Sequence, residues 1–212
     1  MPITFNETPN NTRINFFSVE FDNANAVRGP QNQTYKTLLI GQKTAAGSCA
    51  PPKPVRIASK QTAINYFGAG SHLAEMADYY LRVDPITELF AIAVPDDEAG
   101  IKAKATIAMA GEAGEPGTLY VYINGTRFTG AVRSGDTAGT IAATYAAKAS
   151  AVAELPCTAS ATGDKVTLEA RHPGVAGNGI DVRRNFYDGE ATPDGVAATI
   201  TPFAGGGANP DI

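Results

Sequence analysis

This 212-residue sequence lacks tryptophan, a surplus of basic residues, long apolar runs and a secretory signal. There is no tryptophan, and 17 lysines and arginines stand against 21 aspartates and glutamates, which gives a formal net charge of -4. Nucleic acid is therefore not an expected partner, because binding phosphates requires a basic surface. No apolar run approaches the roughly 20 residues of a membrane-spanning helix, so no membrane partner is expected. The N-terminus lacks the basic and apolar regions of a secretory signal, which favours a cytosolic origin.

Cysteine and histidine are also scarce, with two residues of each. Cys49 and Cys157 are isolated and show no CxxC spacing, so we predict two free thiols in a reducing compartment. His72 and His172 lie far apart in the sequence, and their spacing does not suggest a metal site. We therefore predict neither a metal nor a cofactor.

Three short motifs suggest chemistry only weakly. Residues 41–44 (GQKT) follow an apolar strand but lack the glycine spacing of a phosphate-binding loop. Residues 96–98 (DDE) have no histidine or second acidic cluster beside them and are typical of a solvated boundary loop. Asp188 and Glu190 lack the regular ligand spacing of a calcium loop. The chain is therefore not expected to be an enzyme.

Residues 34–99 are predicted to form an incomplete βαβ core domain. Residues 37–41 form an apolar strand and residues 55–57 a short edge strand. Ser59 and Ser71 are each positioned to cap a helix, and the second helix ends at Asp84. A further strand follows at 88–94 (ELFAIAV), and its nearly continuous apolar sequence predicts burial on both faces.

Residues 100–203 are predicted to form a small α+β module inserted after the core, with two hairpins and one helix. The first hairpin turns at Asn124-Gly125, and Asp136 is placed to cap an alanine-rich helix over 137–152. The second hairpin turns at Gly163-Asp164, and residues 180–183 and 196–201 add strands. Residues 204–212 then form a linker that returns to the missing part of the core. The expected fold class is therefore α+β.

The aromatic residues of this module allow two interpretations. Tyr120, Tyr122, Phe128 and Tyr145 could line a groove for a sugar or a peptide, or they could form core and cross-strand contacts. Aromatic residues on strand and helix faces more often pack in a core, so we favour the second interpretation.

Residues 1–33 are predicted to be an extended arm and connector. Residues 1–15 are too polar to fold alone, whereas residues 17–21 (FSVEF) alternate like a half-buried strand. A polar connector then leads to the core. Such a strand needs a sheet edge to pair with, and this edge can belong to its own domain or to a neighbouring subunit.

Several short segments spread over the whole sequence resemble one protein family, and the most specific are residues 28–33 (RGPQNQ) and 67–71 (FGAGS). The other segments are 16–21 (FFSVEF), 25–27 (NAV), 36–42 (KTLLIGQ), 87–92 (TELFAI), 117–125 (GTLYVYING), 135–138 (GDTA), 177–178 (GN) and 187–193 (YDGEATP). Through these segments the chain as a whole resembles the N-terminal half of tail sheath proteins of Mu-type contractile bacteriophages.

The resemblance implies a structural subunit that polymerises helically around a tail tube and contracts to drive the tube through the host envelope. It implies two partners, namely other sheath subunits joined by strand exchange and the tail tube protein. It also implies a location in the virion tail, with the host cytoplasm during assembly. Within the arm it points to Phe16, Phe17, Val19 and Phe21 as inter-subunit residues. Sheath proteins of this type continue past residue 212 into the rest of the core and a C-terminal arm, so a monomeric state of residues 1–212 alone stays open.

Two other functions compete with the sheath. A phage surface module for carbohydrate or host recognition would need exposed aromatic residues within 100–203. A small hydrolase would need a base and a nucleophile, which the sequence does not offer.

Overall fold

The computed structural model describes residues 35–50 and 52–210, which lie within one compact unit. These residues form three α-helices, one 3-10 helix and ten strands, and the strands are arranged in three sheets. The predicted α+β class is confirmed. The arm residues Phe16, Phe17, Val19 and Phe21 lie outside the described residues.

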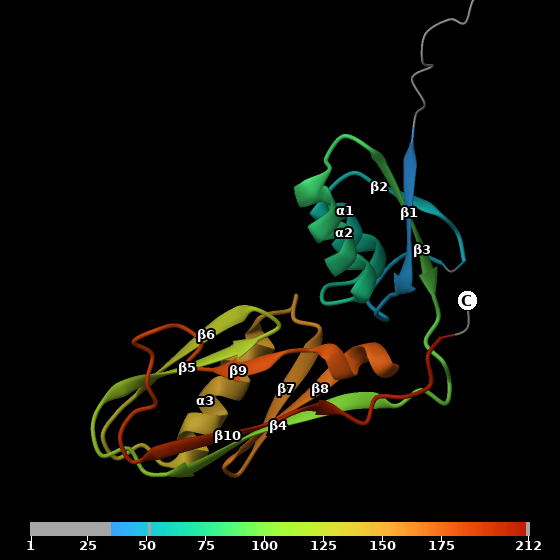
Figure 1. Ribbon diagram of the computed structural model, residues 1–212. Coiled ribbons are helices and arrows are strands. Elements are labelled where there is room, and N and C mark those ends of the chain that lie inside the picture. The colour runs from blue at the N-terminus through green and yellow to red at the C-terminus, as the bar shows by residue number, and fades with distance from the viewer. Residues whose placement is uncertain (1–34, 51, 211–212) are drawn as a thin grey trace, which may run out of the picture. The chain divides into compact units, whose positions relative to one another are not determined.

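The first sheet is mixed and has the strand order β1-β3-β2 (Figure 1). Strand β1 (Lys36–Gln42) pairs in parallel with β3 (Glu88–Val94), and β2 (Val55–Ile57) pairs antiparallel with the other side of β3. Helices α1 (Lys60–Phe67) and α2 (His72–Val83) connect β2 to β3 and pack on one face of this sheet. We call this sheet with its two helices the core sheet.

Both helices of the core sheet begin at the predicted serine caps. The Ser59 hydroxyl accepts a hydrogen bond from the Thr62 amide at the start of α1. The Ser71 hydroxyl does the same for the Ala74 amide at the start of α2, which ends at Asp84 as predicted. Each cap satisfies a backbone donor that has no partner within its helix.

The prediction that residues 88–94 are buried on both faces is wrong for the described structure. Leu89, Ala91 and Ala93 are buried against the helices, but Phe90 and Ile92 on the other face are only half-buried. The apolar pattern indicates a strand that can be covered on two sides, and the described residues cover only one.

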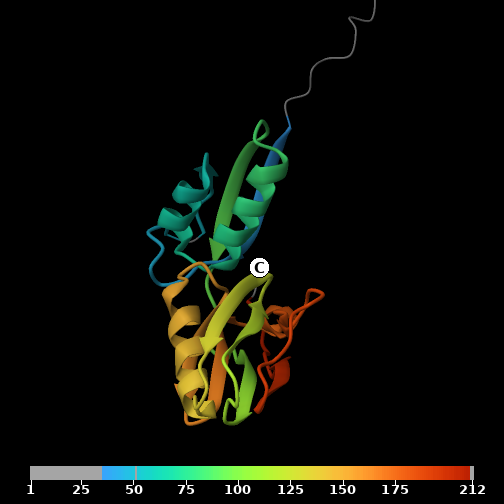
Figure 2. The same ribbon diagram turned by 90° about the vertical axis from the view of Figure 1, so that its left-hand side faces the viewer.

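The inserted module contains the other two sheets and α3 (Ala138–Ala151), which packs against both (Figure 2). One sheet has the order β10-β4-β8-β7 and the other the order β6-β5-β9. Their strands are β4 (Lys102–Gly111), β5 (Gly117–Ile123), β6 (Thr126–Val132), β7 (Cys157–Thr162), β8 (Lys165–Pro173), β9 (Val182–Arg184) and β10 (Val196–Ala204), and a 3-10 helix spans Val175–Gly179.

Two details of the module differ from the sequence analysis. The long strand β4 was not predicted, although it is paired on both sides in its sheet. Helix α3 is capped by Thr137, whose hydroxyl accepts from the Thr140 amide, and not by Asp136. The Asp136 carboxylate instead accepts from the Arg133 amide, which closes the preceding turn.

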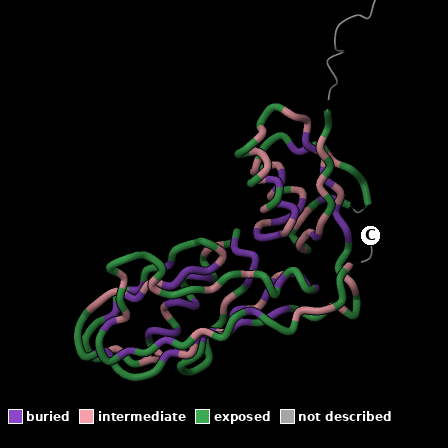
Figure 3. The backbone as a smooth tube through the Cα atoms, viewed as in Figure 1, coloured by how far each residue is buried: buried purple, intermediate pink, exposed green. Residues whose placement is uncertain are grey.

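The buried side chains form two separate hydrophobic clusters (Figure 3). The smaller cluster lies between the core sheet and its helices and includes Phe67, Leu73 and Leu89. The larger cluster fills the module and includes Leu119 and Leu168. The two cores are thus distinct, and independent folding of the module stays a prediction.

The chain enters and leaves the module at neighbouring points. The backbone of Ile101, just before β4, exchanges two hydrogen bonds with Gly207, just after β10, at 2.9 and 3.0 Å. A module whose two ends meet in this way can be inserted into a host domain without separating the host segments on either side.

Candidate assembly surface

One face of the core sheet is apolar and carries no described element. Parallel pairing places Leu38 beside Phe90 and Ile40 beside Ile92, and all four side chains point away from α1 and α2. Leu38 is 51% exposed and Ile40 is 41% exposed. We call these four residues the bare face. Contiguous apolar surface of this kind marks interaction sites in proteins.

The bare face ends at an open strand edge. Among the described residues, β1 forms a ladder only with β3, so the hydrogen-bonding groups along its other side are available to a further strand. At the start of the strand, Glu88 forms ion pairs with Lys36 and Arg56, both at 3.3 Å. Such exposed pairs contribute about 0–1 kcal/mol each to stability.

A cavity of about 370 Å³ lies where the end of β1 meets α2. Ile40, Met76 and Tyr79 give it apolar walls. Pro210 also lines it, which places the last described part of the chain beside β1. Met76 is 41% exposed and faces this cavity.

A second cavity of about 390 Å³ lies between α1, α2 and the β5–β6 hairpin. Its walls contain both polar and apolar residues and come from both the core sheet and the module. The Asn124 amide donates to Glu75 at 2.6 Å, and the Lys60 ammonium pairs with Glu154 at 2.7 Å.

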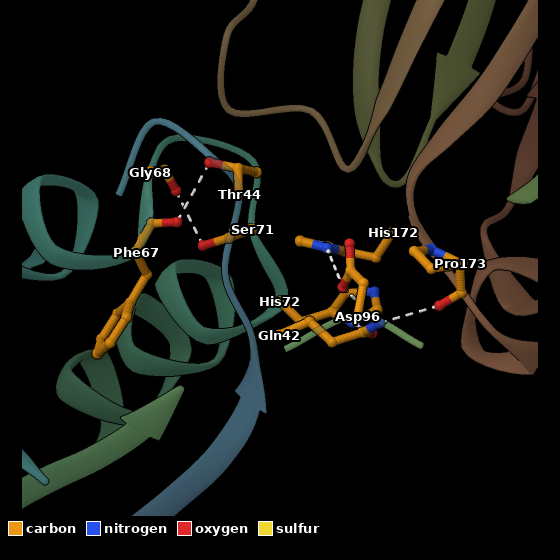
Figure 4. A network of polar contacts seen from close by, with 9 residues as sticks. All are labelled: Gln42, Thr44, Phe67, Gly68, Ser71, His72, Asp96, His172 and Pro173. Carbon is orange, nitrogen blue, oxygen red and sulfur yellow. Dashed lines mark hydrogen bonds and ion pairs between the residues drawn. The ribbon is translucent and has the colours of Figure 1, made fainter. Parts of the chain in front are cut away.

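A polar network, in which Gln42 and His172 are buried and Asp96 is exposed, joins the core sheet to the module at the end of β1 (Figure 4). The Gln42 amide nitrogen donates to Asp96 Oδ1 at 2.9 Å and to the Pro173 carbonyl oxygen at 3.0 Å. His72 Nδ1 lies 3.0 Å from Gln42 Oε1, and His172 Nδ1 lies 3.3 Å from Asp96 Oδ1. The two imidazole rings are 4.8 Å apart between centroids. We call these five residues the polar junction.

Burial controls the protonation of both histidines in the polar junction. It lowers the pKa of His72 and of His172 below the ordinary value of 6.5, because charging a buried ring is costly. The neighbouring His72 lowers the pKa of His172 further, whereas Asp96 opposes the shift. Both rings are therefore neutral at neutral pH.

The loop between α1 and α2 holds this site in place (Figure 4). The Ser71 hydroxyl donates to the Gly68 carbonyl at 2.8 Å, and the Thr44 hydroxyl donates to the Phe67 carbonyl at 3.2 Å. Thr44 of the candidate phosphate loop thus ties the end of β1 to the end of α1.

The aromatic residues of the module are mostly core residues. Tyr122, Phe128 and Tyr145 are buried, as expected, and Tyr120 is half-buried beneath the Arg127 guanidinium. Glu190 accepts a hydrogen bond from the Tyr122 hydroxyl at 2.5 Å.

Two exposed aromatic residues were not predicted. Phe186 and Tyr187 pack edge to face with each other, with ring centroids 5.1 Å apart, and both contact Tyr122.

The polar junction was also missed by the sequence analysis. Its residues come from β1, α2, the connection after β3, and β8, so no local spacing connects them. Asp96 lies in an exposed loop, as expected, but its hydrogen bonds to Gln42 and His172 were not predicted. Within residues 35–50 and 52–210, no group of three or more potential metal ligands occurs, and no helix is long and apolar enough to cross a membrane.

No family model matches the sequence. A curated protein, the Mu-like prophage FluMu tail sheath protein of Haemophilus influenzae, is 37% identical over 212 residues. The alignment covers 100% of this chain and 44% of that protein, so the chain spans less than half of its relative. The resemblance found in the sequence is thereby confirmed. By sequence, the chain is similar to the N-terminal half of this Mu-type phage tail sheath protein.

Proposed function

We propose that the protein is a subunit of a contractile tail sheath, which polymerises helically around a tail tube and contracts to drive the tube through the host envelope. The observation that supports assembly through the core sheet is the open edge of β1 beside the bare face. A head-to-tail contact that does not close on itself generates a helix, as a sheath requires. The partners are other sheath subunits and the tail tube protein. The subunit is assembled in the host cytoplasm and resides in the virion tail.

Residues 1–33 act in this proposal as an exchanged arm. The arm adds a strand to the core sheet of a neighbouring subunit, with Phe17, Val19 and Phe21 facing inward and Phe16 beside them. An added strand supplies backbone hydrogen bonds, and the alternating side chains supply specificity. The polar connector lets the subunits shift during contraction while they remain linked.

The bare face is covered, in this proposal, by the polypeptide that follows in sheath proteins. Support comes from Pro210, which lies beside Ile40 in the apolar cavity, and from the relative, which is more than twice as long as the match. Burying the exposed halves of Leu38 and Ile40 contributes about 1 kcal/mol each. Residues 34–99 are then part of a larger core domain, and residues 100–203 are a module on the outer surface of the sheath.

Electron microscopy of the protein made from the complete reading frame tests the arm. We expect cylinders from the parent and folded subunits without cylinders after deletion of residues 1–22. A sharper comparison is Phe17→Asp against Ser18→Asp. The two changes add the same charge to adjacent positions, but only the first lies on the inward side of the proposed strand. Normal cylinders from the deletion, or equal effects of the two substitutions, would contradict strand exchange.

A second candidate function is carbohydrate or host recognition by the module. The exposed pair Phe186 and Tyr187 favours it, and the Arg183 guanidinium lies 5.3 Å from the Phe186 ring centroid. Aromatic faces beside charged side chains can stack on sugars and hydrogen-bond to them. Titration with host surface polysaccharide should show saturable binding that Phe186→Ala abolishes. The absence of binding by the parent would remove this candidate.

A further inference from the structure

The polar junction determines which nitrogen of His72 carries its proton. The Pro173 carbonyl oxygen can only accept, so the Gln42 amide nitrogen must face it and donate. The amide oxygen is then left 3.0 Å from His72 Nδ1. Since an amide oxygen also only accepts, His72 carries its proton on Nδ1.

The same reasoning applies to His172, with a different result at its second nitrogen. His172 Nδ1 faces the Asp96 carboxylate at 3.3 Å, so this nitrogen donates and Nε2 is unprotonated in the neutral ring. His172 Nε2 is buried and has no hydrogen-bond partner among the described residues. A proton added there would create a buried, charged donor without an acceptor, which is costly.

The charged groups around the junction come from several elements. On the core sheet, Glu75 of α2 and Asp96 after β3 favour a positive charge on His72. At His172, the attraction of Asp96 is opposed by His72 and by Lys102 of β4. Burial is the largest effect at both rings and disfavours the charge.

The direction of the pH effect follows from these shifts. Both histidines have a lower pKa in the closed junction than in an opened or unfolded chain, where the value is near 6.5. The opened state therefore binds more protons below this pH. The closed junction is fully stabilised above about pH 6.5 and weakens as the pH falls toward the lowered pKa values.

We propose that the polar junction is an acid-sensitive lock that fixes the inserted module to the core sheet while both rings are neutral and opens when His172 is protonated. Both histidines of the chain take part in it. The lock does not depend on the sheath function proposed above. It differs from the Lys60–Glu154 pair, whose side chains are exposed and therefore sensitive to salt.

Distance measurements between two spin labels test the lock. Labels at Gln61→Cys and Lys165→Cys lie on exposed positions of the core sheet and the module, and the native thiols are buried. We expect a narrow distance distribution at about pH 7.5 that broadens at about pH 5. In His172→Asn the side-chain amide can replace the Nδ1 donor but cannot be protonated in this range, so its distribution should stay narrow at both values.

The controls separate protonation from other effects of acid. Lys60→Met removes the exposed ion pair and should leave the pH response unchanged. Salt added at neutral pH should not broaden the distance distribution between the labels. An unchanged distribution of the parent at about pH 5, or equal broadening in His172→Asn, overturns the proposal.

Nitrogen NMR of the unlabelled parent provides a measurement without any substitution. With two histidines in the chain, both signals can be assigned without ambiguity. We expect protons on Nδ1 of both rings at neutral pH and titration of both below 6.5. A proton on Nε2 of either ring at neutral pH, or titration of His172 at or above 6.5, overturns the proposal.

Discussion

Three leucine-to-alanine substitutions should show that the two hydrophobic cores contribute separately to stability. Leu168 is fully buried in the module, Leu89 is 1% exposed in the core sheet, and Leu38 is half-exposed on the bare face. Truncation of a fully buried leucine costs about 2–5 kcal/mol, since the lost transfer energy is increased by the cavity left behind. Leu38→Ala should cost about 1 kcal/mol or less, because half of its surface is already in water.

Hydrogen exchange measured segment by segment shows in which core each variant loses stability. A loss of about 3 kcal/mol speeds exchange through opening of that core by about a hundredfold. Leu168→Ala should therefore accelerate exchange in β8 and α3 much more than in α1 and α2. Leu89→Ala should do the reverse. Equal acceleration of both regions in both variants would refute separate cores and the predicted boundary near residue 100.

The remaining predictions concern single contacts. Ser71→Ala removes the buried cap of α2 and should lower the free energy of unfolding by about 1 kcal/mol, measured by urea denaturation. Gly130→Ala places a Cβ 2.3 Å from the Tyr145 hydroxyl oxygen, so the ring must move and the melting temperature should fall by several degrees. Burial raises the pKa of Cys157 to about 11, so this thiol should react with a disulfide reagent at about pH 8 only after denaturation.

The two stability predictions each have a matched comparison. Ser59→Ala removes an exposed cap and should cost less than Ser71→Ala, because water can replace its bond. Gly179→Ala meets no atom within 4 Å and should leave the melting temperature unchanged. Fast reaction of Cys157 in the folded protein, or equal effects within either pair, would contradict the packing described above.

The elements with strong local patterns were predictable from the sequence. The serine caps of α1 and α2 and the Asn124-Gly125 hairpin each depend on a few neighbouring residues, and the structure contains all three. At Asn124 and Gly125 the φ angles are 47° and 76°, the left-handed region that this tight turn requires.

Strand β4 was missed although Ile107 and Met109 are inward residues of its second half, because the inward residues of its first half are small. Ala103 and Ala105 are buried, yet alanine is a weak strand former and gives little alternation in hydrophobicity. The reason for alanine is spatial, since a Cβ placed on Gly177 of the 3-10 helix would lie 3.0 Å from the Ala103 Cβ. A larger residue at 103 would displace this helix. The constraint to a small side chain at position 103 therefore comes from tertiary packing.

The polar junction could not be predicted from local sequence patterns either, and it also links the two cores. Gln42 reaches Pro173, and His72 contacts His172, only after both the core sheet and the module have folded. If only polar contacts couple the two cores, the losses in free energy of unfolding caused by Leu89→Ala and Leu168→Ala should add within about 0.5 kcal/mol at a pH where the junction is open. With the junction closed at neutral pH, part of the stability lost in one core is transmitted to the other. The free energy of unfolding of the double variant should then deviate from the sum of the two single losses. Additivity at every pH would mean that the junction transmits no free energy between the cores, although it holds them in contact.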